Sequence, residues 1–395
     1  MNTSQQLALA HLCQHKGKAS VISIILALLI FLPTFTLSSL YLLQKKLTER
    51  AQKTPLLLAP AQGKAESLLH HLHFQLQDDP IEFTPTDSFD LFDGSPLDAI
   101  PIFLAHQILS KDGRLRAPLL CSHAMYLEFR KLAISSGKKP EHPAEIVIGS
   151  QLAKKWSVNL GDHLRTSPHR LLDLSKAHQL ELLVVGILEP TGGPEDLLAI
   201  TPLETAWIKL GLGHGHPKEN LKGVPKTLHM SIHSEQKGYR RINQNNREEI
   251  HFHQPKSLLP LTAMILLPAD EKERLYALAW GQNHPTLEVI DPISVTERIL
   301  SSLHQLGDIL LLMLLVVSLT SLVLMGLFLR MNFIMRKRDA EILEEMGIPS
   351  FTFATAIAYE WLIYIAMGGA MALILMSFYW FGGLTITELM GVIRN

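Results

Sequence analysis

The stretch that decides the fold runs from Gly307 to Phe381 and holds two long apolar blocks joined by a short charged loop. The first block, Gly307–Leu329, reads GDILLLMLLVVSLTSLVLMGLFL, and its one charged residue is Asp308 at the start. The second block, 354–381, reads ATAIAYEWLIYIAMGGAMALILMSFYWF, with Glu360 as its one charged residue. About 20 apolar helical residues cross the ~30 Å hydrocarbon core of a bilayer. Each block therefore predicts a transmembrane helix.

The loop between these blocks, 330–353, is strongly basic, with Arg330, Arg336, Lys337 and Arg338. Short loops rich in Lys and Arg lie on the cytoplasmic side of a membrane, so we expect this loop to be cytoplasmic. The two flanking helices are then antiparallel, and a short tail, 382–395, lies outside. The simpler interpretation is that the basic loop only fixes the topology and contacts anionic lipid.

A further apolar block, 19–43, carries no charge and follows a polar segment, 1–18, that we expect to form a cytoplasmic amphipathic helix. A secretory signal peptide is the alternative, but the block is too long and no small-x-small cleavage site follows it. Basic residues after the block outnumber those before it, which alone would place the N-terminus outside: Lys45, Lys46, Arg50 and Lys53. A long domain is translocated largely regardless of such charges, so we expect the N-terminus inside.

The region between the first two spans, 45–305, is long enough for one large extracytoplasmic domain or two subdomains. Short strand-like and helix-like segments alternate along it: a helix over Glu66–Leu76, strands at Ile100–Leu104 and Glu145–Gly149, a helix over Gln151–Trp156, and a buried strand at Leu182–Leu188. The expected fold is an α+β membrane protein with three transmembrane helices. One large mixed α/β domain lies between the first helix and the second.

Composition excludes several classes of protein. The chain has 395 residues, a formal net charge of −1 and 47% hydrophobic residues, so it is neither a nucleic-acid binder by charge nor disordered. Its mean hydropathy of +0.17 fits a few spans carrying a large soluble domain. The two cysteines, Cys13 and Cys121, fall on opposite sides of the expected membrane and cannot pair. The outer domain must therefore be held by its core.

The loop sequence RKRDAEILEEMGI, 336–348, resembles the signature R-[KR]-R-[ED]-x-x-x-L-[RE]-x-[LM]-G-[AI] of FtsX-like, MacB-type ABC-transporter permeases. Two outer stretches are similar to the same family: EIVIGSQLAKKW at 145–156 with LGD at 160–162, and VVGILEPTG at 184–192. In that family the loop is a short helix that lies on a separate ATPase. The resemblance implies ATPase-coupling roles for Arg336, Lys337, Arg338, Asp339, Glu341, Glu344 and Gly347.

The resemblance also implies a function and partners. The chain would be the permease subunit of an ABC transporter in the bacterial inner membrane, multi-pass, with its large domain in the periplasm. It would form a homodimer, contact membrane lipid, and couple ATP hydrolysis by a separate ATPase subunit to motion of the outer domain. A periplasmic substrate-binding or adaptor protein is a further expected partner. MacB-type permeases have four spans, and 382–395 is too short for a fourth, which leaves completion of the dimer interface open.

Motifs for catalysis are absent from the sequence. It has no G-x-x-x-x-G-K-[ST] phosphate loop, no H-E-x-x-H and no G-x-S-x-G, so we expect no enzyme activity and ATP binding only in the partner. Glu360 could be a proton or substrate site, although a structural role beside the loop is favoured. Two alternative functions stay open. One is a non-transport regulator of an outer partner such as a cell-wall hydrolase, and the other is a membrane-anchored receptor without an ATPase.

Histidine is abundant, with 19 residues, and two H-x-H pairs fall within the same part of the outer region. Imidazole is a common ligand of zinc, so the sequence predicts a zinc site formed by His214, His216, His251 and His253. The alternative is that these are ordinary surface or hydrogen-bonded histidines. No other cofactor is expected to bind the chain directly.

Overall fold

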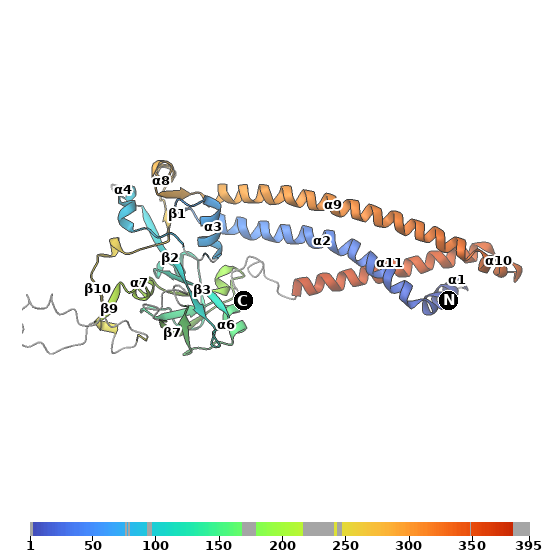
Figure 1. Cartoon of the computed structure of the whole chain (residues 1–395), viewed down its shortest axis with the longest axis horizontal. Helices are drawn as coiled ribbons and strands as arrows, with labels where there is room; N and C mark the ends of the chain where they lie inside the picture. Colours follow the sequence, from blue (N-terminus) through green and yellow to red (C-terminus); the bar gives the residue numbers. More distant parts are fainter. Residues whose placement is uncertain are drawn as a thin grey trace, which may run out of the picture. The chain divides into compact units, whose positions relative to one another are not determined.

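The computed structural model describes residues 3–75, 77, 80–92, 97–167, 179–215, 241–242, 247–347 and 349–381 (Figure 1). The chain divides into two compact units. We call Met1–Lys45 with Ile299–Leu384 the helical unit and Lys46–Arg298 the sheet unit. Each is described by itself.

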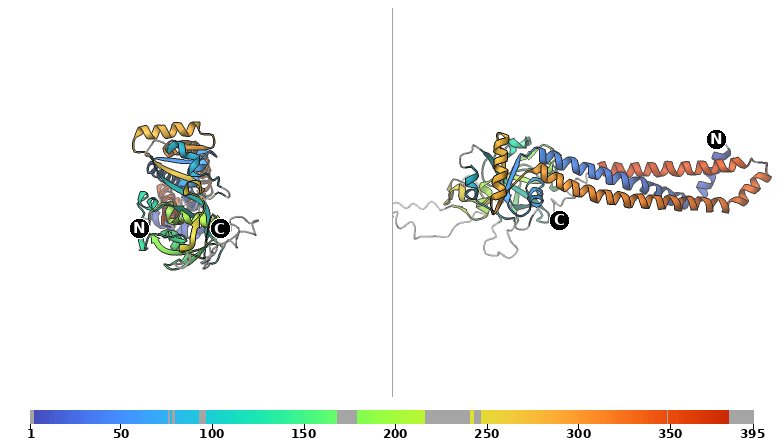
Figure 2. Two further views of the ribbon diagram at one scale, coloured as in Figure 1. Left: turned by 90° about the vertical axis from the view of Figure 1, so that its left-hand side faces the viewer. Right: turned by 90° about the horizontal axis from the view of Figure 1, so that it is seen from above.

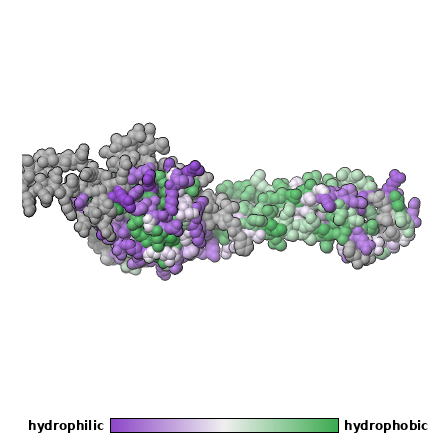
Figure 3. Space-filling model, turned by 90° about the horizontal axis from the view of Figure 1, so that it is seen from below, coloured by the Kyte–Doolittle hydropathy of each residue, from purple (hydrophilic) through white to green (hydrophobic). Residues whose placement is uncertain are grey.

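The helical unit consists of long helices. Its elements are α1 (Thr3–Gln14), α2 (Lys16–Gln52), α9 (Pro292–Met335), α10 (Lys337–Glu345) and α11 (Ser350–Phe381). Within the described residues, three stretches are long and apolar enough to cross a membrane: Lys16–Gln52, Pro292–Met335 and Phe351–Trp380. Hydrophobic residues cover much of the face of these helices seen in Figure 3. The apolar blocks at 19–43, 307–329 and 354–381 all fall within these helices, and α2 and α9 continue beyond the blocks into the sheet unit.

Helix α2 comes close to α9 and to α11 at individual residues, and the three helices lie side by side in the views of Figures 1 and 2. A Cβ atom added to Gly368 of α11 would lie 2.7 Å from Cβ of Leu26, and one added to Gly307 of α9 would lie 2.8 Å from Cδ1 of Leu40. The hydroxyls of Ser39 and Tyr379 are 3.0 Å apart. Small residues let helices approach closely, and such packing drives helix association in a bilayer.

The sheet unit is built on a ten-stranded sheet with the order β12-β1-β11-β2-β3-β8-β5-β7-β4, and β6 pairs with β2 and β7. Its strands are β1 (Leu56–Pro60), β2 (Asp98–Leu109), β3 (Arg116–Ser122), β4 (Ile134–Gly137), β5 (Glu145–Ile148), β6 (His163–Thr166), β7 (Glu181–Leu188), β8 (Ala199–Pro202), β11 (Ala263–Leu267) and β12 (Leu287–Ile290). Most pairs are antiparallel, but β3 with β8 and β5 with β7 are parallel. This mixed sheet confirms the predicted mixed α/β domain.

Short helices surround the sheet. They are α3 (Lys64–His73), η1 (Pro85–Ser88), α4 (Phe89–Phe92), α5 (Met125–Phe129), α6 (Ser150–Trp156), η2 (Pro194–Leu197), α7 (Glu204–Lys209), η4 (Arg247–Glu249), η5 (Lys256–Leu258) and α8 (Glu271–Asn283). A separate two-stranded sheet pairs β9 (Gly213–Gly215) with β10 (Ile250–Phe252). The apolar core lies on the sheet and includes Leu58, Phe103, Leu119 and Trp207.

Three predicted segments need correction. The helix predicted over Glu66–Leu76 begins at Lys64 and ends at His73, because Phe74 adopts a left-handed conformation with φ 55°. The strand predicted at Ile100–Leu104 is longer and becomes β2. The strand predicted as buried at Leu182–Leu188 alternates buried and half-buried residues, because one face packs on the core.

The two longest helices join the sheet at neighbouring strands. Helix α2 is followed directly by β1, and β12 is followed directly by α9. Strands β1 and β12 are antiparallel partners, with Leu57 opposite Ile290. The chain therefore enters the sheet unit at β1 and leaves it after β12, and these two strands are hydrogen-bonded to each other.

Candidate functional site

The motif-bearing loop contains the predicted short helix, α10. Gly347 follows it with φ +81°, and the Gly347 amide donates a hydrogen bond to the Glu344 carbonyl at 2.9 Å. Glycine adopts this left-handed conformation without the steric cost that a Cβ brings. Gly347 therefore ends the helix, and Pro349 follows within two residues.

Most of the predicted coupling residues on α10 point into solvent. Lys337, Arg338, Glu341 and Glu344 are exposed. Lys337 Nζ lies 4.0 Å from Glu341 Oε1, an exposed pair that contributes little to stability. Only the backbone of Asp339 is described. These charged side chains are accessible to a partner and contribute little to the stability of the loop.

Large apolar side chains are exposed on and beside α10. Met335, Ile342, Met346 and Phe351 all have more than 45% of their surface accessible. Apolar side chains next to charged ones, gathered on one short element, are typical of a surface that another protein covers. In a chain that spans a membrane, lipid is the other candidate for this contact.

Arg336 differs from the other predicted residues because its side chain is mostly buried. It precedes α10, and its Nη1 donates to Glu360 Oε1 at 3.0 Å and to Oε2 at 3.3 Å. Its guanidinium carbon also lies 5.2 Å from the centre of the Phe353 ring. Arg336 thus fixes the beginning of α10 to α11.

Glu360 also contacts the N-terminal helix. His11 Nδ1 of α1 lies 3.3 Å from Glu360 Oε1, and α1 packs along α11, where the hydroxyls of Ser4 and Thr355 are 2.7 Å apart. The Glu360 side chain is 4% exposed. One buried carboxylate therefore joins α1, α11 and the start of α10.

The sequence placed Glu360 beside the loop but did not identify its partners. A buried carboxylate is costly unless it is paired. The loop holds several basic residues, and periodicity does not choose Arg336 among them. The contact with His11 joins residues from opposite ends of the chain, and no local pattern in the sequence signals it.

The predicted zinc ligands are only partly within the described residues. The β9–β10 pairing places His251 opposite His214, and the His251 and His253 rings are 4.9 Å apart. His216 lies outside the described residues, and only the backbone of His214 is described. Across the part of the chain that the structure describes, no group of three or more His, Cys, Asp or Glu side chains could hold a metal ion. The zinc site stays a prediction.

Comparisons with known proteins give matches at the level of structure. No family model and no curated protein matches this sequence. The periplasmic region of MacB from Actinobacillus actinomycetemcomitans is similar, with 11% identity, TM-score 0.36, and coverage of 64% of this chain and 97% of that one. The extracellular domain of the noncanonic ABC-type transporter YknZ from Gram-positive bacteria has 12% identity and a TM-score of 0.30, with coverage of 60% of this chain and 98% of that one. A domain of a putative permease protein from Porphyromonas gingivalis has 12% identity and a TM-score of 0.28, with coverage of 60% of this chain and 89% of that one.

Proposed function

We propose that this chain is the permease subunit of a MacB-like ABC transporter, and that it couples ATP hydrolysis in a separate ATPase subunit to motion of the sheet unit. The observation that carries this proposal is the construction of α10. It is a short helix with exposed charged and apolar residues, placed between two helices long and apolar enough to span a membrane, and tied to one of them through Arg336 and Glu360.

In this proposal α2, α9 and α11 cross the bacterial inner membrane. The basic residues around α10 put that helix in the cytoplasm, and residues 45–305 are then periplasmic. Two copies form a homodimer within the lipid, each carrying its own ATPase on α10. A periplasmic substrate-binding or adaptor protein would meet the sheet unit.

The contacts suggest a route for the coupling. A displacement of α10 acts on α11 and α1 through Glu360, and on α9 through the direct connection at Arg336. Helix α9 leads to β12 and helix α2 to β1, so both strands receive the motion of the helices. Substrate need not cross the bilayer in this scheme. The same device would serve a regulator of a cell-wall hydrolase, and transport assays separate that alternative.

The deciding experiment is copurification of the tagged chain from its own membranes, followed by an ATPase assay of the complex in nanodiscs. We expect an ABC ATPase to be retained by the wild type and to be lost or no longer stimulated in Glu341→Arg. Glu189→Arg, which reverses an exposed charge of the sheet unit, is the matched control. Retention of no ATPase by the wild type would favour the receptor without an ATPase.

A zinc-linked role is a second proposal, and it rests on the β9–β10 register that sets His214 opposite His251. Metal analysis of the purified chain tests it. The His251→Ala, His253→Ala double variant should lose bound zinc, and equal metal content in the wild type and the variant would contradict the proposal.

A further inference from the structure

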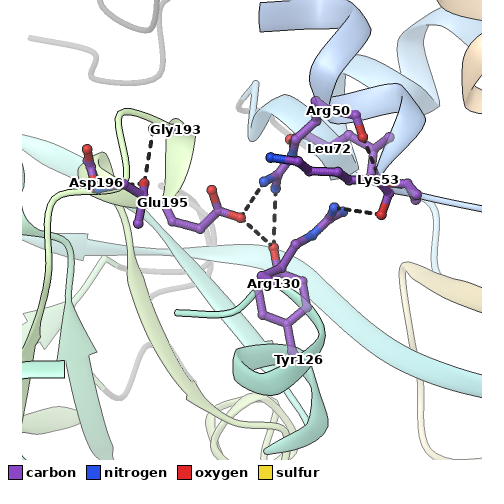
Figure 4. A network of polar contacts seen from close by, with 10 residues as sticks. Arg50, Lys53, Leu72, Tyr126, Arg130, Gly193, Glu195 and Asp196 are labelled. Carbon is purple, nitrogen blue, oxygen red and sulfur yellow. Dashed lines mark hydrogen bonds and ion pairs between the residues drawn. The ribbon is translucent and has the colours of Figure 1, made fainter. Parts of the chain in front are cut away.

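The last turn of α2 carries a buried arginine into the sheet unit (Figure 4). Arg50 is 9% exposed, although it stands only two residues before the end of the helix. A buried guanidinium is retained in a fold only when its donors are satisfied, since the loss of hydration is costly. Its contacts therefore show what the end of α2 is attached to.

Arg50 uses all three of its nitrogen groups. Nη1 donates to Glu195 Oε1 at 2.5 Å, Nη2 to the Tyr126 hydroxyl at 3.3 Å, and Nε to the Leu72 carbonyl at 2.8 Å. The Tyr126 hydroxyl donates to the same Glu195 oxygen at 3.1 Å. We call Arg50, Tyr126 and Glu195 the Arg50 cluster. Its three side chains are buried and form a closed ring of hydrogen bonds.

A second arginine, Arg130, also contacts the end of α2, and here the donor belongs to the segment around α5. Arg130, just after α5, donates from Nη1 to the Lys53 carbonyl at 3.4 Å, directly beyond the end of α2. Its guanidinium carbon lies 5.8 Å from the centre of the Tyr126 ring. The chain segment around α5 thus contacts the end of α2 at two points.

Glu195 is held on a rigid turn. Asp196, its neighbour, accepts hydrogen bonds from the Thr191 amide and hydroxyl and from the Gly192 amide, each at 2.9 Å. Gly149 approaches so closely that a Cβ there would lie 2.3 Å from the Glu195 carbonyl oxygen. A force on the Glu195 carboxylate is therefore passed to the strands beside this turn, β5, β7 and β8.

The pKa shifts of two groups indicate the charge state of this cluster: Glu195 is ionised, and the neighbouring His73 is neutral. Burial alone would raise the pKa of Glu195, but attraction to Arg50 and Arg130 and the hydrogen bond from Arg50 outweigh burial, so the pKa lies below its usual range. Burial, together with the nearby Arg50, lowers the pKa of His73 to about 3. The ion pair is therefore intact at neutral pH, with a neutral imidazole beside it.

The Arg50 cluster connects parts of the sheet that are not neighbours. Helix α2 leads into β1, which lies between β12 and β11 in the sheet. Tyr126 belongs to α5, which follows β3 in the sequence. Glu195 belongs to η2, which lies between β7 and β8 in the sequence. Strands β11 and β2 separate β1 from β3 in the sheet. The side-chain contacts of Arg50 therefore link the end of α2 directly to the half of the sheet that contains β3, β8, β5 and β7.

We infer that Arg50 is a positioning residue for coupling, the joint through which displacement of α2 reaches the half of the sheet unit that contains α5 and η2. The inference rests on the proposed function. Without the Arg50 cluster, motion of the helices still reaches β1 and β12 through the main chain and α5 through the contact of Arg130 with Lys53, but the direct contact of Arg50 with Glu195 in η2 is lost.

The test is hydrogen exchange on the full chain with its copurified ATPase in nanodiscs, with and without a non-hydrolysable ATP analogue. Arg50→Met with Glu195→Gln removes both charges together, which is far better tolerated than leaving one buried charge unpaired. Tyr126→Phe is a milder variant that keeps the ion pair. Lys256→Met with Glu204→Gln removes an exposed ion pair of 3.1 Å elsewhere in the sheet unit and is the matched control.

In the wild type and the control, we expect the analogue to change exchange in β1, β12, α5 and η2. In the double variant the change in β1 and β12 stays, the change in η2 is lost and the change in α5 is reduced. Exchange without nucleotide shows that the sheet unit is still folded. Tyr126→Phe gives a smaller loss. A full change at α5 and η2 in the double variant overturns the inference alone. No change at β1 and β12 in the wild type overturns the proposed function, and the inference with it.

Discussion

Arg336 donates from one nitrogen to both carboxylate oxygens of Glu360, at 3.0 Å and 3.3 Å, and so ties the start of α10 to α11. Both side chains are mostly buried, 17% and 4% exposed. Removing one partner of a buried ion pair costs about 3 to 5 kcal/mol, whereas removing both is much less harmful. Arg336→Met and Glu360→Gln should each lower the thermal unfolding temperature of the detergent-solubilised chain more than the double variant does. Additive losses would show that the two residues do not act as a pair.

The proposed function requires α10 to be a continuous helix. Proline in a helix interior costs about 3 kcal/mol, so Leu343→Pro should break this short helix. We expect ATPase stimulation in nanodiscs to be lost. The helix content of the whole chain, measured by circular dichroism, should fall by only a few residues. Leu343→Ala keeps the helix and is the control. Stimulation that survives the proline would mean that the loop is a topology signal only.

Two adjacent glycines of α11 provide a matched test of helix packing. A Cβ at Gly368 would lie 2.7 Å from Leu26 Cβ, whereas one at Gly369 would meet nothing within 4 Å. Overpacking typically costs about 1 to 3 kcal/mol, so Gly368→Leu should lower the thermal stability of the helical unit and Gly369→Leu should not. Equal effects of the two changes in the same unfolding assay would rule out the close approach of α2 and α11.

We expect three buried histidines to make the stability of the sheet unit sensitive to mild acid. Burial lowers the pKa of His70, His71 and His73, so below about pH 6.5 the unfolded chain binds protons that the folded chain does not. The free energy of unfolding should fall as pH drops, by up to about 1.4 kcal/mol per pH unit for each histidine. The depressed pKa of Glu195 acts in the same direction, but only at lower pH, as the carboxylate becomes protonated.

Urea unfolding of the full chain between pH 7.5 and pH 5.5, followed by fluorescence of buried Trp156 and Trp207, measures this slope. His73→Gln should reduce the slope by the share of one histidine. His123→Gln, which replaces an exposed histidine, is the control. A slope that is the same in the wild type and His73→Gln would contradict the assignment of His73 as neutral.

Local patterns predicted the apolar helices and α10 because length, hydropathy and a terminal glycine are read within a short window. They do not give the ends of α2 and α9, since an apolar block marks the stretch that could lie in hydrocarbon and not where the helix ends. Arg50 shows the consequence. In the sequence it counts among the charges flanking a span, but its side chain is buried in the sheet unit. Its partner Glu195 is 145 residues away, and pairing at that separation depends on tertiary structure.

The ladder between β1 and β12 also limits how the two helices attached to it can move. Four residue pairs set its register, from Leu57 with Ile290 to Pro60 with Leu287. Sliding one strand along the other by less than a residue, about 3.4 Å, breaks these hydrogen bonds without forming new ones. A piston stroke of α2 past α9 is therefore blocked at this end. In the proposed function, the two helices would therefore act on the sheet unit by tilting or twisting as a pair, and not by sliding past each other.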